Sequence, residues 1–585
     1  MNELLSNLKI REFYPVAGLA LLGTAGLVWG LEIGIVTVII LAILGTVVTG
    51  VFAYRQFNFK ALIFLLGMIT IMALGVIGTQ GSYNTALGWP KMWGLALAGL
   101  IGLAILLQPN ENHVYVRDLL LITAVVAAVV ILLTYDWVRF PTDFEFLNRI
   151  GFTISQVFAV PKSEFRIDDA LGGICVTIMP VFYTEFISRV ERKQKFLIGL
   201  FLLAIFLLLF TVLLTGTRSL WIGIVIGAGA YAIGHFVFHE SKKAAAYIVG
   251  FTSMLPLLSM VWLANPGGKF SEILSGLDYR FELISNSGWL IPDFWLVGGG
   301  AGSYPGLYSR YILNESHFYI AHSHNLLSNL AIETGIISTS VVIFLILVPI
   351  IIFLTNIKEI NFSRFSAENA AVFSTFIFIL LLDDPFWGGG SVPFLFVPLT
   401  FLLKDHLGRA KITILRTSAV SVITFIAILL GNYYLFGRNV TIPEYLSNKA
   451  YANLELAGFP NEVLGFYDPL EEPDEIINTY KGIYADTKHK SAGYRLGIHF
   501  LREGDFTEAF KYLEEGYRLQ PKHPGIRENY AFTLVWLDQL EEAKPLGQQT
   551  NKFTQKLAAF VTWWKETGKD DLSNQALEMI SLMNN

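Results

Sequence analysis

The sequence predicts an all-α protein, made of a polytopic transmembrane helix bundle followed by a water-soluble helical domain. Of the 585 residues, 54% are hydrophobic and 15% are charged, and the mean hydropathy is +0.53, so the chain has more apolar side chains than a soluble core of this length buries. Apolar runs of about 20 residues, the length that crosses a bilayer, recur as far as Phe436. Charged residues with helical periodicity follow. We therefore expect a transmembrane domain over residues 1–436 and a helical domain over 437–585.

The apolar runs define about thirteen spans. They lie near 13–30, 32–53, 61–78, 90–107, 118–135, 169–187, 196–215, 219–238, 244–263, 330–355, 369–383, 387–403 and 412–436. The first two runs are joined only through Gly30-Leu31-Glu32, which fits a tight hairpin or one broken element. No small-residue cleavage site follows Lys9 and Arg11, so we expect the first run to remain as a span.

The distribution of basic residues predicts the orientation, because short loops rich in lysine and arginine stay in the cytoplasm. With the N-terminus inside, the basic clusters fall in loops on the inner side; they are Arg55/Lys60, Arg189/Arg192/Lys193/Lys195, Lys242/Lys243, Lys358/Arg364 and Lys404/Arg409/Lys411. The long loops 136–168 and 264–329 then lie outside, and an odd number of spans places the C-terminal domain outside too. This is the pattern of a multi-pass protein of the cytoplasmic (inner) membrane.

Charge and cysteine content exclude two other possibilities. The net charge of -5 and the isoelectric point near 6.1 provide no basic stripe for a nucleic-acid backbone, so no nucleic-acid partner is expected. Cys175 is the one cysteine and lies in an apolar run, so an intrachain disulfide is impossible and a packing role is expected.

The C-terminal domain contains a repeat of small and apolar residues. Within 490–523 the pattern is Leu496-Gly497, Phe500, Gly504-Asp505, Ala509, Leu513 and Pro521. This spacing resembles the tetratricopeptide repeat, in which small residues let two antiparallel helices approach closely. A degenerate second copy begins at Pro524 and keeps Ala531 and Ala543, and 444–486 would supply earlier helices of one small solenoid. Two roles remain open: a stabilising cap for the membrane domain, or a binding site for a protein partner.

Three histidines, His317, His322 and His324, lie close together before an apolar segment. A metal site is one interpretation, since imidazoles bind zinc. No carboxylate or cysteine at a matching spacing accompanies them, and alternate positions on a helix point apart, so we expect no metal. A second interpretation is that the histidines only tolerate an interfacial position.

A third interpretation rests on a resemblance. His324-Asn325, a gap of nine residues and Gly335 reproduce the start of the signature of the O-antigen ligase and polymerase family of membrane glycosyltransferases. The sequence departs from that signature at Ser338-Thr339-Ser340, where the family has further glycines, which leaves ligase and polymerase both open. The resemblance covers roughly 150–350. It includes three further landmarks, namely GTRSLW at 216–221, DYRFELISNSGW at 278–289 and GGGAGSY at 298–304.

The resemblance implies transfer of a glycan from a polyprenyl-diphosphate carrier, such as undecaprenyl diphosphate, to an acceptor hydroxyl at the outer membrane face. In that reaction His324 would act as the general base, and Asn325, Gly335 and His322 would support it. A single displacement would invert the anomeric centre. The resemblance implies no metal and no cofactor.

Arginines are expected to bind the diphosphate of the donor, because a guanidinium stays charged and binds phosphate oxygens with two parallel hydrogen bonds. The resemblance points to Arg218 and Arg280, with Arg310 as a third candidate. Arg218 lies at the edge of an apolar run, where snorkelling to lipid headgroups is the alternative. For Arg280 and Arg310 the alternative is a solvated charge in a long loop.

Two further motifs have simpler explanations. GGGAGSY lacks the Lys-Ser/Thr of a phosphate-binding P-loop, so we expect a flexible bend that lets the loop fold back over a site. Asp383-Asp384-Pro385 could orient a sugar, but ending a helix before proline is the expectation that we favour.

The acceptor remains open. A lipid or cell-wall acceptor would make the protein a ligase of lipopolysaccharide type, a second glycan would make it a polysaccharide polymerase, and a protein hydroxyl would make it a protein O-oligosaccharyltransferase. From other classes, a transporter or lipid flippase would also use many spans with interfacial arginines. A membrane-anchored scaffold would leave the arginine and histidine landmarks unexplained.

The orientation can be tested by cysteine labelling after replacement of Cys175 by alanine. We predict that cysteines introduced at the N-terminus, in 188–195 and in 404–411 are labelled only from the cytoplasm, and that cysteines in 264–329 and 440–585 are labelled from outside. Labelling of the C-terminal domain from the cytoplasm would mean an even number of spans. Labelling of 264–329 from the cytoplasm would separate that segment from an outward-facing donor.

Overall fold

The computed structural model describes most of the chain in atomic detail. The described residues are 10–30, 35–53, 57–109, 113–134, 137, 145–157, 167–215, 218–238, 254, 257–259, 261, 263–264, 279–312, 320–355, 364–383, 387, 392–405, 414–456, 474–550 and 552–584. Across these residues the secondary structure is helical, with turns and loops and no strand. The prediction of an all-α protein is therefore confirmed for this part of the chain.

The chain divides into two compact units. The first contains Met1–Val261, Phe294–Gly302 and His322–Ile442, and the second contains Trp262–Asp293, Ser303–Ala321 and Pro443–Asn585. The predicted loop 264–329 is thus shared between them, because 294–302 and the part from His322 on belong to the first unit and the remainder belongs to the second.

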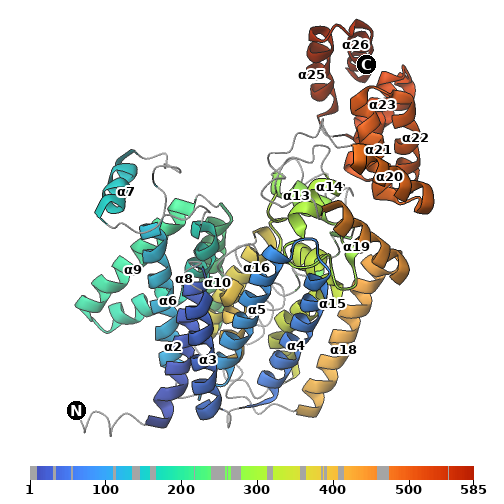
Figure 1. Ribbon diagram of the computed structural model, residues 1–585. Coiled ribbons are helices and arrows are strands. Elements are labelled where there is room, and N and C mark those ends of the chain that lie inside the picture. The colour runs from blue at the N-terminus through green and yellow to red at the C-terminus, as the bar shows by residue number, and fades with distance from the viewer. Residues whose placement is uncertain are drawn as a thin grey trace. The chain divides into compact units, whose positions relative to one another are not determined.

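The first unit is a bundle of apolar helices (Figure 1). Its helices are α2 (Ile10–Gly30), α3 (Ile35–Ala53), α4 (Phe59–Gln80), α5 (Thr85–Leu106), α6 (His113–Thr134), α7 (Glu145–Val157), α8 (Ile167–Glu191), α9 (Lys195–Thr215), α10 (Arg218–Phe238), α15 (Leu326–Thr355), α16 (Arg364–Leu382), η4 (Val392–Phe394), α17 (Val397–Asp405), α18 (Ile414–Asn432) and the π-helical turn η5 (Tyr433–Gly437). Within the described residues, seven helices are long and apolar enough to cross a membrane. Five shorter apolar helices accompany them, at Tyr14–Val28, Val36–Val51, Ser219–Ile233, Ala371–Leu382 and Val392–Lys404.

The first two apolar runs form separate helices that pack against each other, α2 and α3. The two backbones come close together at Gly18 and Gly45, where a Cβ added to either glycine would lie 2.9 Å from the carbonyl oxygen of the other. Small residues of this kind let helix backbones come into contact, which is how apolar helices associate where no hydrophobic gain is available. Of the two alternatives for this pair, the structure has the hairpin.

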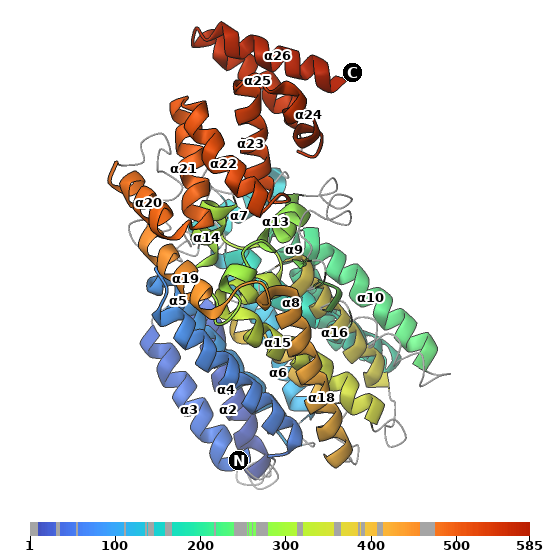
Figure 2. The ribbon, with the colours of Figure 1, turned by 90° about the vertical axis from the view of Figure 1, so that its right-hand side faces the viewer.

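Helix α15 runs between α4 and α18 (Figures 1 and 2). It has a break in its N-terminal third. The break is at Gly335, whose φ of 82° and ψ of 169° are not helical. A side chain at this position would place its Cβ 2.2 Å from the carbonyl oxygen of Leu296. Only glycine combines this backbone conformation with so close a neighbour, so the residue is needed for the packing of 294–302 against α15.

Helix α16 is held by polar contacts near its first turn. The Arg117 guanidinium donates to Glu368 Oε2 at 2.7 Å and to the Thr184 hydroxyl at 2.7 Å, and it pairs with Glu185 at 2.9 Å. These contacts join α6, α8 and α16. A buried charge requires such partners, so the network fixes the start of α16 while its other end carries Asp383.

The second unit contains the helical repeats. Its helices are α13 (Tyr279–Ser287), η3 (Pro292–Phe294), α14 (Tyr304–Tyr311), α19 (Ile442–Leu456), α20 (Asp474–Thr487), α21 (Lys490–Glu503), α22 (Phe506–Leu519), α23 (Pro524–Trp536), α24 (Leu540–Gln548), α25 (Phe553–Glu566) and α26 (Asp570–Asn584). The boundary between the two units falls within η3, after Asp293, and at the start of α19, before Pro443. We call α20–α26 the repeat domain. Its helices stack in sequence order, and α21 to α23 lie side by side in both views (Figures 1 and 2).

The predicted small positions of the repeat have the expected roles. Gly504, at φ 79°, ends α21, and the Asp505 side chain accepts from the Glu508 amide to start α22. A Cβ on Gly497 would lie 2.6 Å from Leu513 Cγ, so the glycine permits the close contact between α21 and α22. Ala509 is fully buried in the same core. The turn and the helix pair fall where the sequence predicts them.

Candidate functional site

His324 lies in the non-helical chain directly before α15. Its φ of 57° is in the left-handed region, which few residues other than glycine occupy. The side chain is 24% exposed, and Nδ1 lies 3.1 Å from Asp383 Oδ1. The imidazole is therefore held on one edge by a carboxylate while it remains accessible.

Asp383 directly follows α16 and connects two helices to His324. Its second oxygen, Oδ2, accepts a short hydrogen bond from the Ser219 hydroxyl. Ser219 comes directly after Arg218, the first residue of α10. The helix ends before Asp383, as the sequence predicts. The contacts of its side chain could not be predicted, because the two residues that bind the Asp383 carboxylate are 59 and 164 residues away in sequence.

Asn325 fixes the backbone next to His324. Its Oδ1 accepts from the Ser328 amide at 2.9 Å, which caps the start of α15. Its Nδ2 donates to the Leu381 carbonyl at 3.0 Å and to the Ser259 hydroxyl at 3.1 Å. Since Leu381 precedes Asp383 by two residues, Asn325 holds the end of α16 beside the start of α15.

The glycine-rich segment 298–302 is part of the core of the first unit. Gly298, Gly300 and Gly302 have positive φ and are buried. The amides of Gly299 and Gly300 donate to the carbonyls of Ile332 and Glu333 at 2.8 and 3.0 Å. The prediction of a flexible bend is wrong: the glycines serve close backbone packing next to the break in α15.

A second charged cluster, which the sequence reading missed, lies along α15. The Glu333 carboxylate is fully buried and pairs with Lys91 Nζ at 3.1 Å. It also accepts from the Trp387 indole nitrogen at 2.7 Å, and Lys91 lies 5.6 Å from the centre of the Trp387 ring. The sequence could have revealed this pair, because Lys91 and Glu333 both lie inside apolar runs. A charged side chain is energetically unfavourable there and usually has a structural or functional role.

The Glu333 cluster supports the geometry at His324. Glu333 is nine residues after His324 on one segment, and Trp387 is four residues after Asp383 on the other. The two segments are thus joined by His324 to Asp383, by Asn325 to Leu381 and by Glu333 to Trp387. These three hydrogen bonds restrict how far α15 and the end of α16 can shift relative to each other. A precisely oriented imidazole requires such a restriction.

His322 brings a possible metal-binding geometry. His322, His324 and Asp383 each offer one ligand atom, and these atoms lie within 4.8 Å of one another. We expected no metal because histidines at alternate positions of a helix point apart and no carboxylate lies at a matching spacing. The structure has both histidines in non-helical chain and supplies a carboxylate from Asp383. His317 lies outside the described residues.

The structure brings some of the predicted residues together and assigns others to the second unit. His324 and Ser219 both contact Asp383, and Asn325 contacts Leu381 near the end of α16. Arg218 precedes Ser219 at the start of α10, and Gly335 lies further along α15. Arg280 is the second residue of α13 and is partly exposed, and Arg310 is the penultimate residue of α14. The joint approach of these two arginines to His324 stays a prediction.

One comparison with known proteins bears on the repeat domain. Residues 500–558 match the family model of the tetratricopeptide repeat, which confirms the repeat predicted from the small-residue spacing. Neither a curated protein nor a solved structure matches the chain.

The ion pair on α15 gives a test that needs no assay of function. Glu333→Gln keeps an oxygen for the Trp387 indole but leaves the Lys91 charge without its counter-ion, and removing one partner of a buried pair lowers the free energy of unfolding by about 3 kcal/mol. We expect a clear fall in the melting temperature of the detergent-solubilised protein. Adding Lys91→Met should restore part of the loss. Equal melting temperatures for the single and the double variant would show that the two side chains are not coupled.

Proposed function

We propose that this protein is a membrane glycosyltransferase that moves a glycan from a polyprenyl-diphosphate carrier to an acceptor hydroxyl at the outer face of the cytoplasmic membrane. The observation that carries the proposal is the contact of His324 Nδ1 with Asp383 at 3.1 Å. It supplies a partly exposed imidazole whose orientation is fixed by a carboxylate, at the residue that the ligase and polymerase signature reserves for the base.

The pairing with Asp383 determines which nitrogen would act. An ionised carboxylate accepts hydrogen bonds only, so Nδ1 carries the proton and Nε2 keeps its lone pair. Nε2 would accept the proton of the acceptor hydroxyl, and Asp383 would stabilise the resulting imidazolium, as an aspartate does beside a catalytic histidine in other enzymes. His324 is then suited to the general base step.

The reaction balances without a cofactor. The acceptor oxygen forms a bond to the anomeric carbon, and the bond from that carbon to the diphosphate oxygen breaks. The hydroxyl proton moves to His324 Nε2, and the polyprenyl diphosphate leaves with the electron pair. A single displacement of this kind inverts the anomeric centre, and its barrier depends on how well the leaving negative charge is stabilised.

Positive charge at the site would come from Arg218 and from two helix starts. Helices α10 and α15 both begin here, at Arg218 and Leu326. The N-terminal end of a helix carries a partial positive charge and free amide groups, which favour anions. This setting supports a role for Arg218 with the diphosphate, and Arg280 and Arg310 are proposed to add to it from the second unit.

The apolar helices of the first unit support the proposed membrane location. Helices of this length and hydropathy fit a bilayer, and a polyprenyl carrier requires a site at the lipid boundary. The outward side is proposed from the positive-inside pattern. Membrane lipid would then surround the first unit, and the second unit would be extracytoplasmic.

The acceptor class stays open within the proposal. A ligase, a polysaccharide polymerase and a protein O-oligosaccharyltransferase share the donor and the base and differ only in which hydroxyl attacks. Glycan profiles of a strain without the protein would separate them, through loss of attachment, of chain length or of protein glycosylation. A transporter or flippase would need no oriented imidazole, so the pair of His324 and Asp383 favours transfer chemistry.

A second candidate mechanism has a specific observation in its favour, which is the cluster of His322, His324 and Asp383 within 4.8 Å. Two imidazoles and a carboxylate can hold Zn²⁺ with a position left open. In that case His324 would be a ligand and not a base, and the cation would neutralise the diphosphate. The two mechanisms make opposite predictions for His322.

Replacement of His324 tests the main proposal. His324→Ala should reduce transfer by roughly 10²–10⁴-fold, because the general base is lost, while donor binding stays nearly intact, because no binding charge is removed. His322→Ala should be mild. The measurement uses purified protein, a polyprenyl-diphosphate glycan and a defined acceptor, with and without chelator. Full activity of His324→Ala would refute the mechanism, and chelator-sensitive transfer that needs both histidines equally would establish the metal mechanism.

Replacement of Arg218 tests the proposed diphosphate site. Arg218→Lys keeps the charge but loses the planar fork, so we expect donor binding to weaken about tenfold, the effect of losing one charge-assisted hydrogen bond of roughly 1.5 kcal/mol. The affinity is measured by titration of the donor in the absence of acceptor. Arg189→Lys, in the α8 ion pair with Glu185, is the matched control, and equal affinities of the two variants would remove Arg218 from the donor site.

A further inference from the structure

Helix α14, which carries Arg310, cannot be stable by itself. It has eight residues, Tyr304–Tyr311, and isolated helices shorter than about 12 residues are marginal in water. The last four carbonyl groups of a helix have no partner within the helix. For α14 these include the carbonyls of Ser309 and Tyr311, the two residues on either side of Arg310. Their partners therefore decide whether this turn keeps its shape.

The repeat domain supplies both partners. Arg495, in α21, is 2% exposed and donates from Nη2 to the Ser309 carbonyl at 3.2 Å. His523, directly before α23, donates from Nε2 to the Tyr311 carbonyl at 3.1 Å. A cationic donor at the C-terminal end of a helix also interacts favourably with the helix dipole. The two bonds hold the backbone of α14 on both sides of Arg310.

The contacts of His523 keep its Nε2 proton directed at the Tyr311 carbonyl. Its Nδ1 accepts from the Ile526 amide at 3.2 Å, so the proton must be on Nε2, which faces the Tyr311 carbonyl. Burial, together with the smaller effect of the neighbouring Lys490, Arg495 and Arg527 charges, lowers the pKa of His523 to about 3 against the raising effect of the Tyr311 bond. The ring therefore stays neutral, and the bond persists over the whole physiological pH range.

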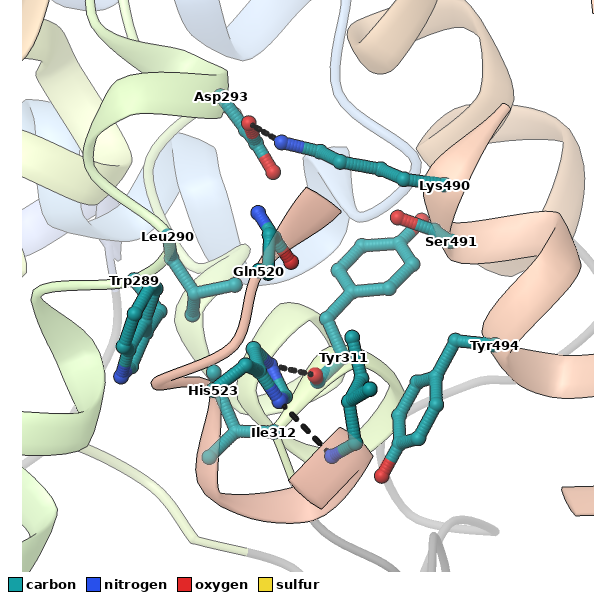
Figure 3. A pocket seen from close by; sticks show the side chains of 11 residues that line it. Trp289, Leu290, Asp293, Tyr311, Ile312, Lys490, Ser491, Tyr494, Gln520 and His523 are labelled. Atoms are coloured by element: carbon teal, nitrogen blue, oxygen red, sulfur yellow. Dashed lines mark hydrogen bonds and ion pairs between the residues drawn. The ribbon is translucent and has the colours of Figure 1, made fainter. Parts of the chain in front are cut away.

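Other contacts extend the same interface within the second unit (Figure 3). Lys490 forms a short ion pair with Asp293, and the rings of Trp289 and His523 lie 5.5 Å apart. The Ser287 and Tyr304 hydroxyls, 2.9 Å apart, join α13 to α14. Helix α21 thus contacts the chain before the glycine-rich segment, at Asp293, and after it, at Ser309.

The hollow between these residues is too small for a ligand. Its volume of about 20 Å³ has room for a water molecule and little more. The side chains around it include Trp289, Leu290, Tyr311 and Tyr494. This face of the repeat domain is therefore packed against the chain's own segments and is not an open groove for a peptide or a sugar.

We infer that the repeat domain positions α14, and with it Arg310, through the contacts of Arg495 and His523 with the backbone on either side of that arginine. Arg495 and His523 are positioning residues, and the occupant of this face of the repeat domain is the chain's own 303–312 segment. The consequence for donor binding rests on the proposed function, whereas the consequence for α14 does not.

The structural part is tested by hydrogen exchange on the full-length protein in detergent. Arg495→Ala and His523→Ala should each speed exchange of the 304–312 amides by about 10- to 100-fold, the range expected for loss of one buried hydrogen bond. Exchange in α25 and α26 should stay the same, which would exclude general unfolding. Arg518→Ala is the matched control, because Arg518 is 75% exposed on the neighbouring helix α22. Unchanged exchange in α14 of both variants would overturn the inference.

The functional part is tested by steady-state kinetics and a double-mutant cycle. Arg495→Ala should raise the KM for the polyprenyl-diphosphate donor and leave kcat within about twofold, and Arg495→Lys should restore part of the loss. In an Arg310→Ala background, Arg495→Ala should have no further effect on KM, because both changes act through the same side chain. Additive effects on KM would overturn the role of Arg310 as the residue being positioned.

Failure of the anchoring of α14 and failure of the proposed function would give different results. Faster exchange in α14 together with no transfer by the unmodified protein would support the anchoring and reject the proposed function. Normal exchange in α14 together with active, donor-dependent transfer would reject the anchoring and leave the proposed function in place.

Discussion

The backbone of α15 imposes the constraint on which the first unit depends. An apolar helix that breaks at Gly335 leaves amide and carbonyl groups that need partners, and in an apolar surrounding each unpaired group is costly. The segment 294–302 supplies them: Ile336 donates to the Trp295 carbonyl at 2.7 Å, and the amides of Gly299 and Gly300 reach Ile332 and Glu333. The break and the inserted segment therefore require each other, and together they fix the register of α15.

That register determines where the polar side chains of α15 and of the segment before it lie. His324 and Asn325 precede the first turn of α15, and Glu333 lies on its inner face, so each meets a residue at the end of α16 or just after it. Arg117 holds the start of α16 through Glu368, which limits how far Asp383 can move at the other end. The proposed general base would depend on this rigidity, because a displacement of about 1 Å is enough to weaken catalysis by orders of magnitude.

In the second unit, the repeat domain stabilises another segment of its own chain. Tetratricopeptide helices offer a stack whose neighbouring faces bury a continuous core, and here one end of the stack also donates to the carbonyls of a short helix that could not persist alone. The tail thus has a physical reason to be attached to this chain, whether or not it also binds a protein partner through its other faces. Exposed Trp563 and Leu577 on α25 and α26 are available for that purpose.

The sequence by itself determined the long apolar helices and the first helix pair of the repeat, since periodicity and apolar length are local properties. It located α4, α5 and α9 within a few residues, and the turn at Gly504-Asp505. It did not predict α7, α13 and α14, which lie in segments that were expected to be long loops. It could not give the partner of His324, because Asp383 is 59 residues away and its position depends on how α16 packs. The same holds for Lys91 and Glu333, separated by 242 residues, and for the glycines of 298–302, whose role is set by a backbone that passes beside them only in the folded chain. Tertiary structure decided these pairings, because the partner of a side chain depends on how the helices pack. That packing produces no periodic pattern in the sequence.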